Sequence, residues 1–422
     1  MKIAFYLPNK NCHKDCKNVD LGNPGIGGTE YTIIALAYHL SISNNRHTIY
    51  LLAHNVNNLP NACNTLQANN ITEILSICKE KQIDCLVIQN SPETNQILYQ
   101  GLDDIKIVVW AHSFMSRKQW NLYARSSNVK RIVCVGNEEL EQYCDHRAYK
   151  KSVVIFNPFP LPNIKSQIIP FSQRKNEVTF LASIVPHTNF HLLAKIWKEV
   201  LESVPDAHLN VIGSGNLYNN TKRLGKYRIA EEEYEKKFMP YLLDQNGKLL
   251  SSVTFWGKLG NEKNQILKRT KIGVANPGGY ETFCISAVEM QLYGAKVISK
   301  KKGGLLDSIY DKDNLFTSEK DFVDYIIKGL KSTDLDYNHT FEFLQLNFSF
   351  KVIEKQWLQL FSEVECEVPV RPVKLECKNV TIVHRLRYFN KKIKMMLPFG
   401  YRWMPTVKFY EAIWNRIKSL FL

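Results

Sequence analysis

Two series of short apolar runs, each run followed by a helical pattern, constrain the fold of this chain more than any other feature. The order strand, helix, strand is typical of a parallel sheet with helices on both faces. The first series predicts strands at 2–8, 47–53, 83–89, 105–112, 131–136 and 152–157. The second predicts strands at 177–184, 207–213, 252–257, 271–275, 295–299 and 314–317. We therefore expect an α/β protein with two Rossmann-like, doubly wound parallel sheets.

The segment between the two series, 156–171, contains four prolines and no helical period, so it is predicted to be a linker. A length of 422 residues suits two domains of ordinary size. We expect an N-terminal domain at 1–165, a C-terminal domain at 166–365 and a tail at 366–422. Helices are predicted at 29–43, 71–82, 116–126, 138–145, 187–203, 261–269, 283–293, 319–331 and 348–363, with an insertion at 217–248.

Composition excludes several classes of protein. A hydrophobic content of 45% can fill real cores, so a mainly disordered chain is excluded. No apolar run approaches the ~18 residues of a membrane span, and the apolar run at the start is too short for a secretory signal. The ten cysteines are scattered, which favours reduced thiols in a cytosolic protein. Cys12, His13 and Cys16 lack a second ligand pair at zinc spacing, so no metal site is expected there.

The positive charge is concentrated at the C-terminus. The chain carries a formal net charge of +15, and residues 371–422 hold twelve Lys or Arg but only two acids. Large apolar residues are interleaved with these charges. Within 406–422 they recur at steps of three and four, which predicts an amphipathic helix; they are Val407, Tyr410, Ile413, Trp414, Ile417 and Phe421. We favour an anionic membrane surface as the partner of the tail; packing on the body and single-stranded nucleic acid are the alternatives.

Two loops at predicted strand ends carry polar or glycine-rich sequence. Gly25, Gly27 and Gly28 precede a helix and let backbone approach a ligand, although the pattern is not the G-x-G-x-x-G of a dinucleotide site. A simple packing turn is the alternative. His112 ends a strand, where a histidine can bind a sugar hydroxyl or shuttle a proton, or be only a structural polar group.

The segment 275–304 gives the strongest signal. Glu281 follows a strand and Glu289 lies eight positions later, a separation of roughly 12 Å if wholly helical. That distance suits two ends of one extended ligand, with helical amides near Phe283 to Ile285 available for an anion between them. Two solvated acids flanking an ordinary helix are the alternative.

This segment resembles the E-x7-E region of glycosyltransferase family 4, whose members are retaining enzymes of the GT-B fold. The matching positions are Glu281, Phe283, Glu289, Met290, Gly294, Val297 and Ile298, followed by the pair Gly303 and Gly304. Residues 27–30, His112, Asn157-Pro158 and 204–216 are similar to other parts of the family pattern. The resemblance covers about residues 1–365 and leaves out the tail.

The resemblance implies two domains that face a cleft and a hexosyltransferase of polysaccharide biosynthesis. Glu281 would hold the donor sugar and stabilise positive charge, and Glu289 would bind the ribose. Gly27, Gly28 and the helix start at Phe283 and Cys284 would hold the diphosphate, and His112 would contact the transferred sugar. The donor would be a nucleotide diphosphate sugar, with a glycan or lipid-linked acceptor, no cofactor or metal, and no nucleic-acid partner. The enzyme would be cytoplasmic and peripheral at the membrane.

The chain departs from the family pattern near the diphosphate. Ser183 and Thr188 stand where members usually carry Arg and Lys, and Cys284 replaces a usual glycine. Lys258, or Lys222, Arg223, Lys226 and Arg228 of the insertion, could supply the missing charge. A GT-B scaffold that binds glycan or nucleotide without turnover is therefore the alternative function.

Overall fold

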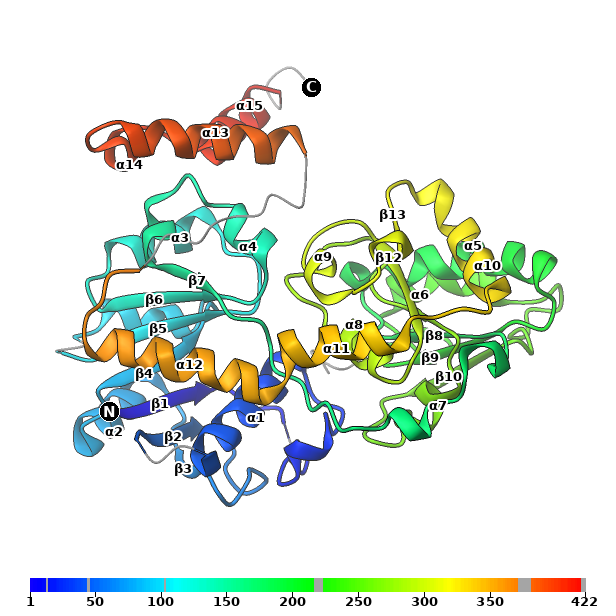
Figure 1. The fold of residues 1–422 in the computed structure, drawn as a ribbon, viewed down its shortest axis with the longest axis horizontal. Coiled ribbons are helices and arrows are strands. Elements are labelled where there is room, and N and C mark those ends of the chain that lie inside the picture. The colour runs from blue at the N-terminus through cyan, green and yellow to red at the C-terminus, as the bar shows by residue number, and fades with distance from the viewer. Residues whose placement is uncertain (13, 44–45, 102–103, 216–222, 371–380, 419–422) are drawn as a thin grey trace. The chain divides into compact units, whose positions relative to one another are not determined.

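The computed structural model describes residues 1–422 except 13, 44–45, 102–103, 216–222, 371–380 and 419–422 (Figure 1). The chain forms two compact units. Unit 1 comprises residues 1–13, 33–156 and 353–422, and unit 2 comprises residues 14–32 and 157–352. The predicted candidates His13 and Lys222 lie outside the described residues.

Unit 1 is built on a seven-stranded, all-parallel sheet in the order β3-β2-β1-β4-β5-β6-β7. Its strands are β1 (Lys2–Leu7), β2 (Thr48–Ala53), β3 (Asn64–Gln67), β4 (Cys85–Gln89), β5 (Lys106–Ala111), β6 (Val129–Cys134) and β7 (Ser152–Val154). Helices α1 (Gly28–Ser43), α2 (Ile71–Lys81), α3 (Arg117–Arg125) and α4 (Asn137–Glu141) connect them. Six of these strands are those predicted. The seventh, β3, was missed because its sequence, NTLQ, has only one large apolar residue.

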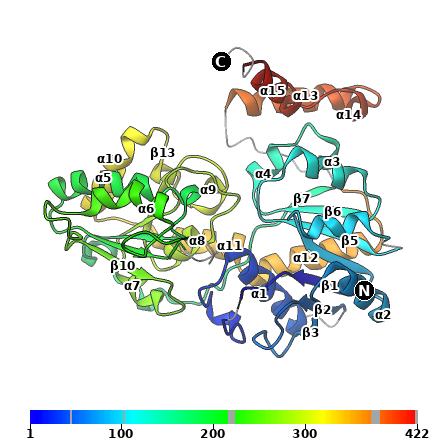
Figure 2. The same ribbon diagram turned by 180° about the vertical axis from the view of Figure 1, so that it is seen from behind.

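Helix α12 (Phe350–Glu365) completes the core of unit 1, although unit 2 precedes it in the chain (Figures 1 and 2). The fully buried Trp357 ring lies 4.7 Å from the Trp110 ring and 6.0 Å from the Phe5 ring. The predicted boundaries therefore differ from the observed units: residues 353–365 were assigned to the C-terminal domain and the tail was set apart. The reason is that the apolar face of α12 packs on the first sheet.

Unit 2 contains a six-stranded parallel sheet in the order β10-β9-β8-β11-β12-β13. Its strands are β8 (Glu177–Leu181), β9 (His208–Ile212), β10 (Val253–Gly257), β11 (Ile272–Val274), β12 (Lys296–Lys300) and β13 (Leu315–Phe316). Its helices are α5 (Phe190–Ser203), α6 (Glu232–Phe238), α7 (Lys263–Arg269), α8 (Ile285–Leu292), α9 (Leu305–Ser308), α10 (Phe322–Lys331) and α11 (Tyr337–Phe348). All six strands were predicted. The described part of the insertion forms α6, whose Tyr234 and Phe238 join the core.

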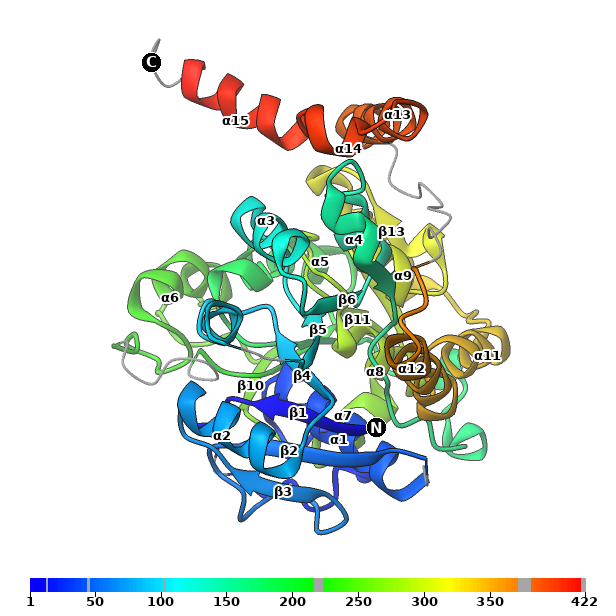
Figure 3. The same cartoon turned by 90° about the vertical axis from the view of Figure 1, so that its left-hand side faces the viewer.

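The tail forms α13 (Ile382–Met396), α14 (Gly400–Trp403) and α15 (Val407–Lys418), which belong to unit 1 (Figure 3). Three of its cations are buried, namely Arg387, Lys391 and Lys394. Lys391 Nζ donates to the Tyr149 hydroxyl at 2.6 Å, and Lys394 Nζ donates to the carbonyl oxygen of Asp145. In the described part of the chain, no helix has both the length and the apolar composition needed to cross a bilayer.

Candidate functional site

Glu281 lies in the loop between β11 and α8, where two asparagines hold it. Asn276 Nδ2 donates to Glu281 Oε1 at 2.8 Å, and Asn189 Nδ2 donates to Asn276 Oδ1 at 2.9 Å. Burial raises the pKa of Glu281, and the Asn276 bond partly opposes that shift. Sequence reasoning missed both asparagines. Asn276 lies two residues after the end of β11, and a polar residue near that carboxyl end was the available signal.

Gly303 and Gly304 fix the backbone of this loop. Gly304 N donates to the carbonyl oxygen of Glu281 at 2.7 Å. A Cβ added to Gly304 would lie 2.1 Å from the carbonyl oxygen of Thr282, and one added to Gly303 would lie 2.6 Å from that of Glu281. Gly303 also has φ = 68°, a conformation that favours glycine. The glycine pair therefore allows two backbones to pack directly and sets the position of Glu281.

Glu289, on α8, forms a buried ion pair with Lys263 of α7. Lys263 Nζ lies 3.1 Å from Glu289 Oε1 and also donates to the carbonyl oxygens of Asn23 and Gly260, each at 3.1 Å. The side chains of Lys263 and Glu289 are 5% and 9% exposed. Lys263 was not predicted. Its position on the same helical face as the buried Ile266 and Leu267 was the signal that the sequence offered.

The predicted glycine loop lies against this ion pair. Asn23 Oδ1 accepts hydrogen bonds from Gly25 N and Ile26 N, both at 2.9 Å. Gly25 has φ = 92°, and a Cβ there would lie 3.1 Å from the carbonyl oxygen of Leu259. Gly28 begins α1, and a Cβ on it would lie 3.4 Å from Cδ1 of Ile285, the first residue of α8. The structure thus brings the loop, Lys263 and the start of α8 together.

Helix α8 begins at Ile285, two residues later than predicted, and this changes two assignments. The Phe283 ring is 2% exposed and packs on Phe348 with ring centroids 5.1 Å apart, so only the backbone of Phe283 remains available to a ligand. Cys284 precedes the helix with φ = 77° in place of the usual glycine. Burial, followed by the charge of Glu281, raises the pKa of Cys284 to about 12, so it stays a neutral thiol.

Ser183 and Thr188, where the family resemblance implies an Arg and a Lys, carry small uncharged side chains. Ser183 and Thr188 are both buried, and Thr188 Oγ1 donates to the carbonyl oxygen of Ser183 at 2.6 Å. Neither side chain can therefore take the place of a cation. Lys258 directly follows β10; the partial desolvation of its otherwise exposed side chain, followed by the charge of Lys14, lowers its pKa. Arg223 lies 3.5 Å from Glu232.

His112 belongs to unit 1 and immediately follows β5. Asn90 Oδ1 accepts a hydrogen bond from its backbone N at 3.1 Å, and its ring lies 4.5 Å from the Trp110 ring. Burial lowers the pKa of His112 to about 3. The imidazole is therefore neutral at physiological pH, where it can hydrogen-bond a hydroxyl but is a poor proton shuttle.

Comparisons with known proteins agree with this architecture. Residues 163–340 match the family model described as glycosyl transferases group 1. An uncharacterized glycosyltransferase of Haemophilus influenzae is 20% identical over 296 residues, which are 68% of this chain and 75% of the relative. Anabaena HepE, solved in complex with UDP and glucose, superposes with a TM-score of 0.60 at 14% identity, covering 86% of this chain and all of its own. A glycosyltransferase of Rickettsia africae gives 0.61 at 14% identity, covering 86% and 98%. The predicted GT-B fold is confirmed.

Proposed function

We propose that this chain, whose residues 163–340 match the family model of glycosyl transferases group 1, is a retaining hexosyltransferase. It would transfer a sugar from a nucleoside diphosphate to a glycan or lipid-linked acceptor. The observation that supports this most is that Glu281 and Glu289 are each held in a separate polar network of unit 2. Such fixed groups can act on developing charge without reorganising during the reaction. Crystallised HepE binds UDP, so UDP is the first nucleotide to test.

In this proposal the two carboxylates have different tasks. Glu281 contacts the transferred sugar and stabilises positive charge on it, and Glu289 accepts hydrogen bonds from the ribose. The glycine loop and the backbone amides at the start of α8 hold the diphosphate. His112, neutral at physiological pH, contacts a sugar hydroxyl. Lys263 already occupies one oxygen of Glu289, so the ribose would share this carboxylate with it.

The test separates binding from turnover. Glu289→Gln keeps a hydrogen-bonding partner for Lys263 and should weaken UDP binding at least tenfold in titration calorimetry. Glu281→Gln should lower turnover by orders of magnitude while UDP affinity changes little. Glu342→Gln, an exposed carboxylate on α11, is the matched control. Unchanged UDP affinity in the Glu289 variant, or near-normal turnover in the Glu281 variant, would remove that residue from the site.

A binding protein without turnover is a second candidate, favoured by one observation. Ser183 and Thr188 stand where the family resemblance implies cations, and the Thr188 hydroxyl donates to the backbone carbonyl of Ser183. Two cations aimed at a leaving diphosphate would contribute several kcal/mol, since removal of one preorganised donor costs about 3 kcal/mol. Slow hydrolysis of a UDP-sugar without acceptor would support the enzyme. UDP-sugar binding with no turnover for any acceptor would support the scaffold.

We further propose that the tail holds the protein on the cytoplasmic surface of an anionic membrane. Thirteen of the 23 exposed large hydrophobic side chains in the described structure lie in residues 381–418, less than a tenth of the chain. Six exposed cations accompany them: Arg385, Lys392, Arg402, Lys408, Arg416 and Lys418. Each contributes about 1 kcal/mol near such a surface, and aromatic insertion adds a part that salt does not screen. Co-sedimentation with anionic vesicles at low and high salt tests this, and no binding at low salt would refute it.

A further inference from the structure

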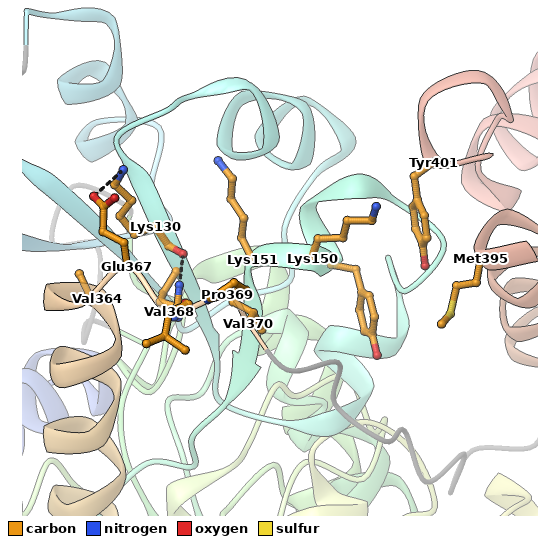
Figure 4. A pocket seen from close by; sticks show the side chains of 12 residues that line it. Lys130, Lys150, Lys151, Val364, Glu367, Val368, Pro369, Val370, Met395 and Tyr401 are labelled. Carbon is orange, nitrogen blue, oxygen red and sulfur yellow. Dashed lines mark hydrogen bonds and ion pairs between the residues drawn. The ribbon is translucent and has the colours of Figure 1, made fainter. Parts of the chain in front are cut away.

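Unit 1 contains a pocket that none of the candidate site residues line. Its volume is about 540 Å³, a size that suits a small organic ligand. Its walls come from β6, from the turn before β7, from the segment after α12 and from the tail helices α13 and α14. Figure 4 shows Lys130 and Lys150 on the wall formed by the body of unit 1, with Met395 across from them on the tail.

The lining combines an excess of positive charge with apolar surface. Lys130, Arg131, Lys150 and Lys151 line the pocket, and Glu367 is its one acid among the described residues. Lys130 lies 3.7 Å from Glu367, which balances one charge. Valines 364, 368 and 370, with Pro369 and Met395, supply the apolar part.

The cations differ in how far the protein satisfies them. Arg131 lies 3.6 Å from Glu363, which balances its charge, and donates to the carbonyl oxygens of Lys130 and Val368; only its buried Nε lacks a hydrogen-bond partner among the described residues. Lys151 donates to two carbonyl oxygens, and burial, followed by Lys130 and Arg147, lowers its pKa to about 8. Lys150 Nζ lies 4.9 Å from the centre of the Tyr401 ring and makes no hydrogen bond to a described residue. Lys150 is therefore the cation best able to meet an anion.

We propose that this pocket binds the headgroup and first acyl carbons of one anionic phospholipid molecule. The proposal rests on the proposed membrane association of the tail. The lipid phosphate meets Lys150, with Lys130 adding positive charge to the same pocket, and the acyl carbons lie along Val368 and Met395. A membrane lipid is the fitting source because the tail closes one wall of the pocket. Met396, next to Met395, is 82% exposed and continues the apolar surface outward.

The charge of the lining favours an anionic occupant. Four cations and one acid among the described residues line the pocket, so an anion is the better complement.

The experiment titrates the full chain with dihexanoyl phosphatidylglycerol below the concentration at which it forms micelles. We expect saturable binding of one lipid per chain, at least tenfold tighter than that of dihexanoyl phosphatidylcholine or glycerol 3-phosphate. Lys130→Ala with Lys150→Ala should weaken this binding at least tenfold. The same number of charges removed at the exposed Lys320 and Lys331 of unit 2 should leave it unchanged. Val368→Trp, which fills the pocket without a change of charge, should also abolish it.

Three results would overturn the proposal. One is equal affinity for the phosphatidylglycerol and phosphatidylcholine probes, and another is unchanged affinity in the Lys130/Lys150 variant. The third is equally tight binding of glycerol 3-phosphate, which would make this a site for small phosphates. Vesicle binding and UDP binding are measured on the same proteins. If the pocket does not bind the lipid but the protein still binds vesicles, the membrane proposal stands and the pocket proposal is wrong. UDP binding reports separately on the donor site.

Discussion

Helices α12 and α15 have similar apolar patterns, but the apolar residues of α12 are buried and those of α15 are exposed. In α12 the apolar residues Ile353, Trp357, Leu360, Phe361 and Val364 are all at most 3% exposed. In α15 the apolar residues recur at nearly the same sequence intervals, but Tyr410, Ile413, Trp414 and Ile417 are 40–58% exposed. The first helix covers a sheet, whereas nothing described covers the apolar residues of the second. Periodicity therefore predicts an amphipathic helix but does not identify what its apolar face contacts.

The largest expected difference between the two helices is in stability. Trp357→Ala should lower the free energy of unfolding by about 3–5 kcal/mol, because the ring is fully buried against Trp110 and Phe5. Trp414→Ala should change it by about 0.5 kcal/mol or less. Urea denaturation followed by circular dichroism measures both. Equal losses in the two variants would mean that α15 is packed as α12 is.

A smaller effect is expected at the contact that holds the tail. Asp145 Oδ2 accepts hydrogen bonds from Asn390 Nδ2 and from Val407 N, both at 2.7 Å. Asp145→Ala removes both, which should cost about 1–3 kcal/mol of tail docking. Limited proteolysis should then cleave between 381 and 418 faster, while α12 stays protected. Cleavage at the wild-type rate would show that Asp145 does not hold the tail.

The smallest effect on stability should accompany a clear effect on vesicle binding. Ile413→Ala with Trp414→Ala should remove most of the salt-resistant binding to anionic vesicles and leave the melting temperature within about 2 °C of the parent. Leu346→Ala, at an exposed apolar residue of unit 2, is the control. Unaltered vesicle binding in the double variant would separate α15 from the membrane.

Much of the fold could be predicted because buried parallel strands are continuous apolar runs. The elements not predicted were the polar strand β3, the helices α6, α9 and α11, and the helical bounds of the tail. The domain boundaries were harder to predict, because the sequence of an amphipathic helix does not say which sheet the helix packs on. Helix α12 packs on the first sheet although it follows unit 2 in the chain. The spacing of Glu281 and Glu289 in the sequence was enough to select them as candidate carboxylates. Asn276, Asn189 and Lys263 could not be selected in this way, because they meet those carboxylates from loops and helices distant in sequence.

The surroundings of the tail could also be predicted only in part. The sequence favours a membrane surface as the partner of the tail over packing on the body, and the described tail packs part of its charge on unit 1. Arg387, Lys391 and Lys394 turn inward, while Arg416 and Lys418 stay exposed. Charge counted along a sequence cannot separate these two groups, because burial depends on a partner such as Tyr149. Phe421, a predicted member of the amphipathic helix, lies outside the described residues.

The return of α12 to the first sheet has a consequence for synthesis on the ribosome. Translation delivers the N-terminal strands first, but Trp110 and Phe5 lack their Trp357 neighbour until more than 350 residues have been made. Unit 2 has all its segments by residue 352 and can close earlier. A nascent chain halted after unit 2 has emerged should therefore show a protease-resistant unit 2 beside an open unit 1. In this protein the part synthesised first is completed last.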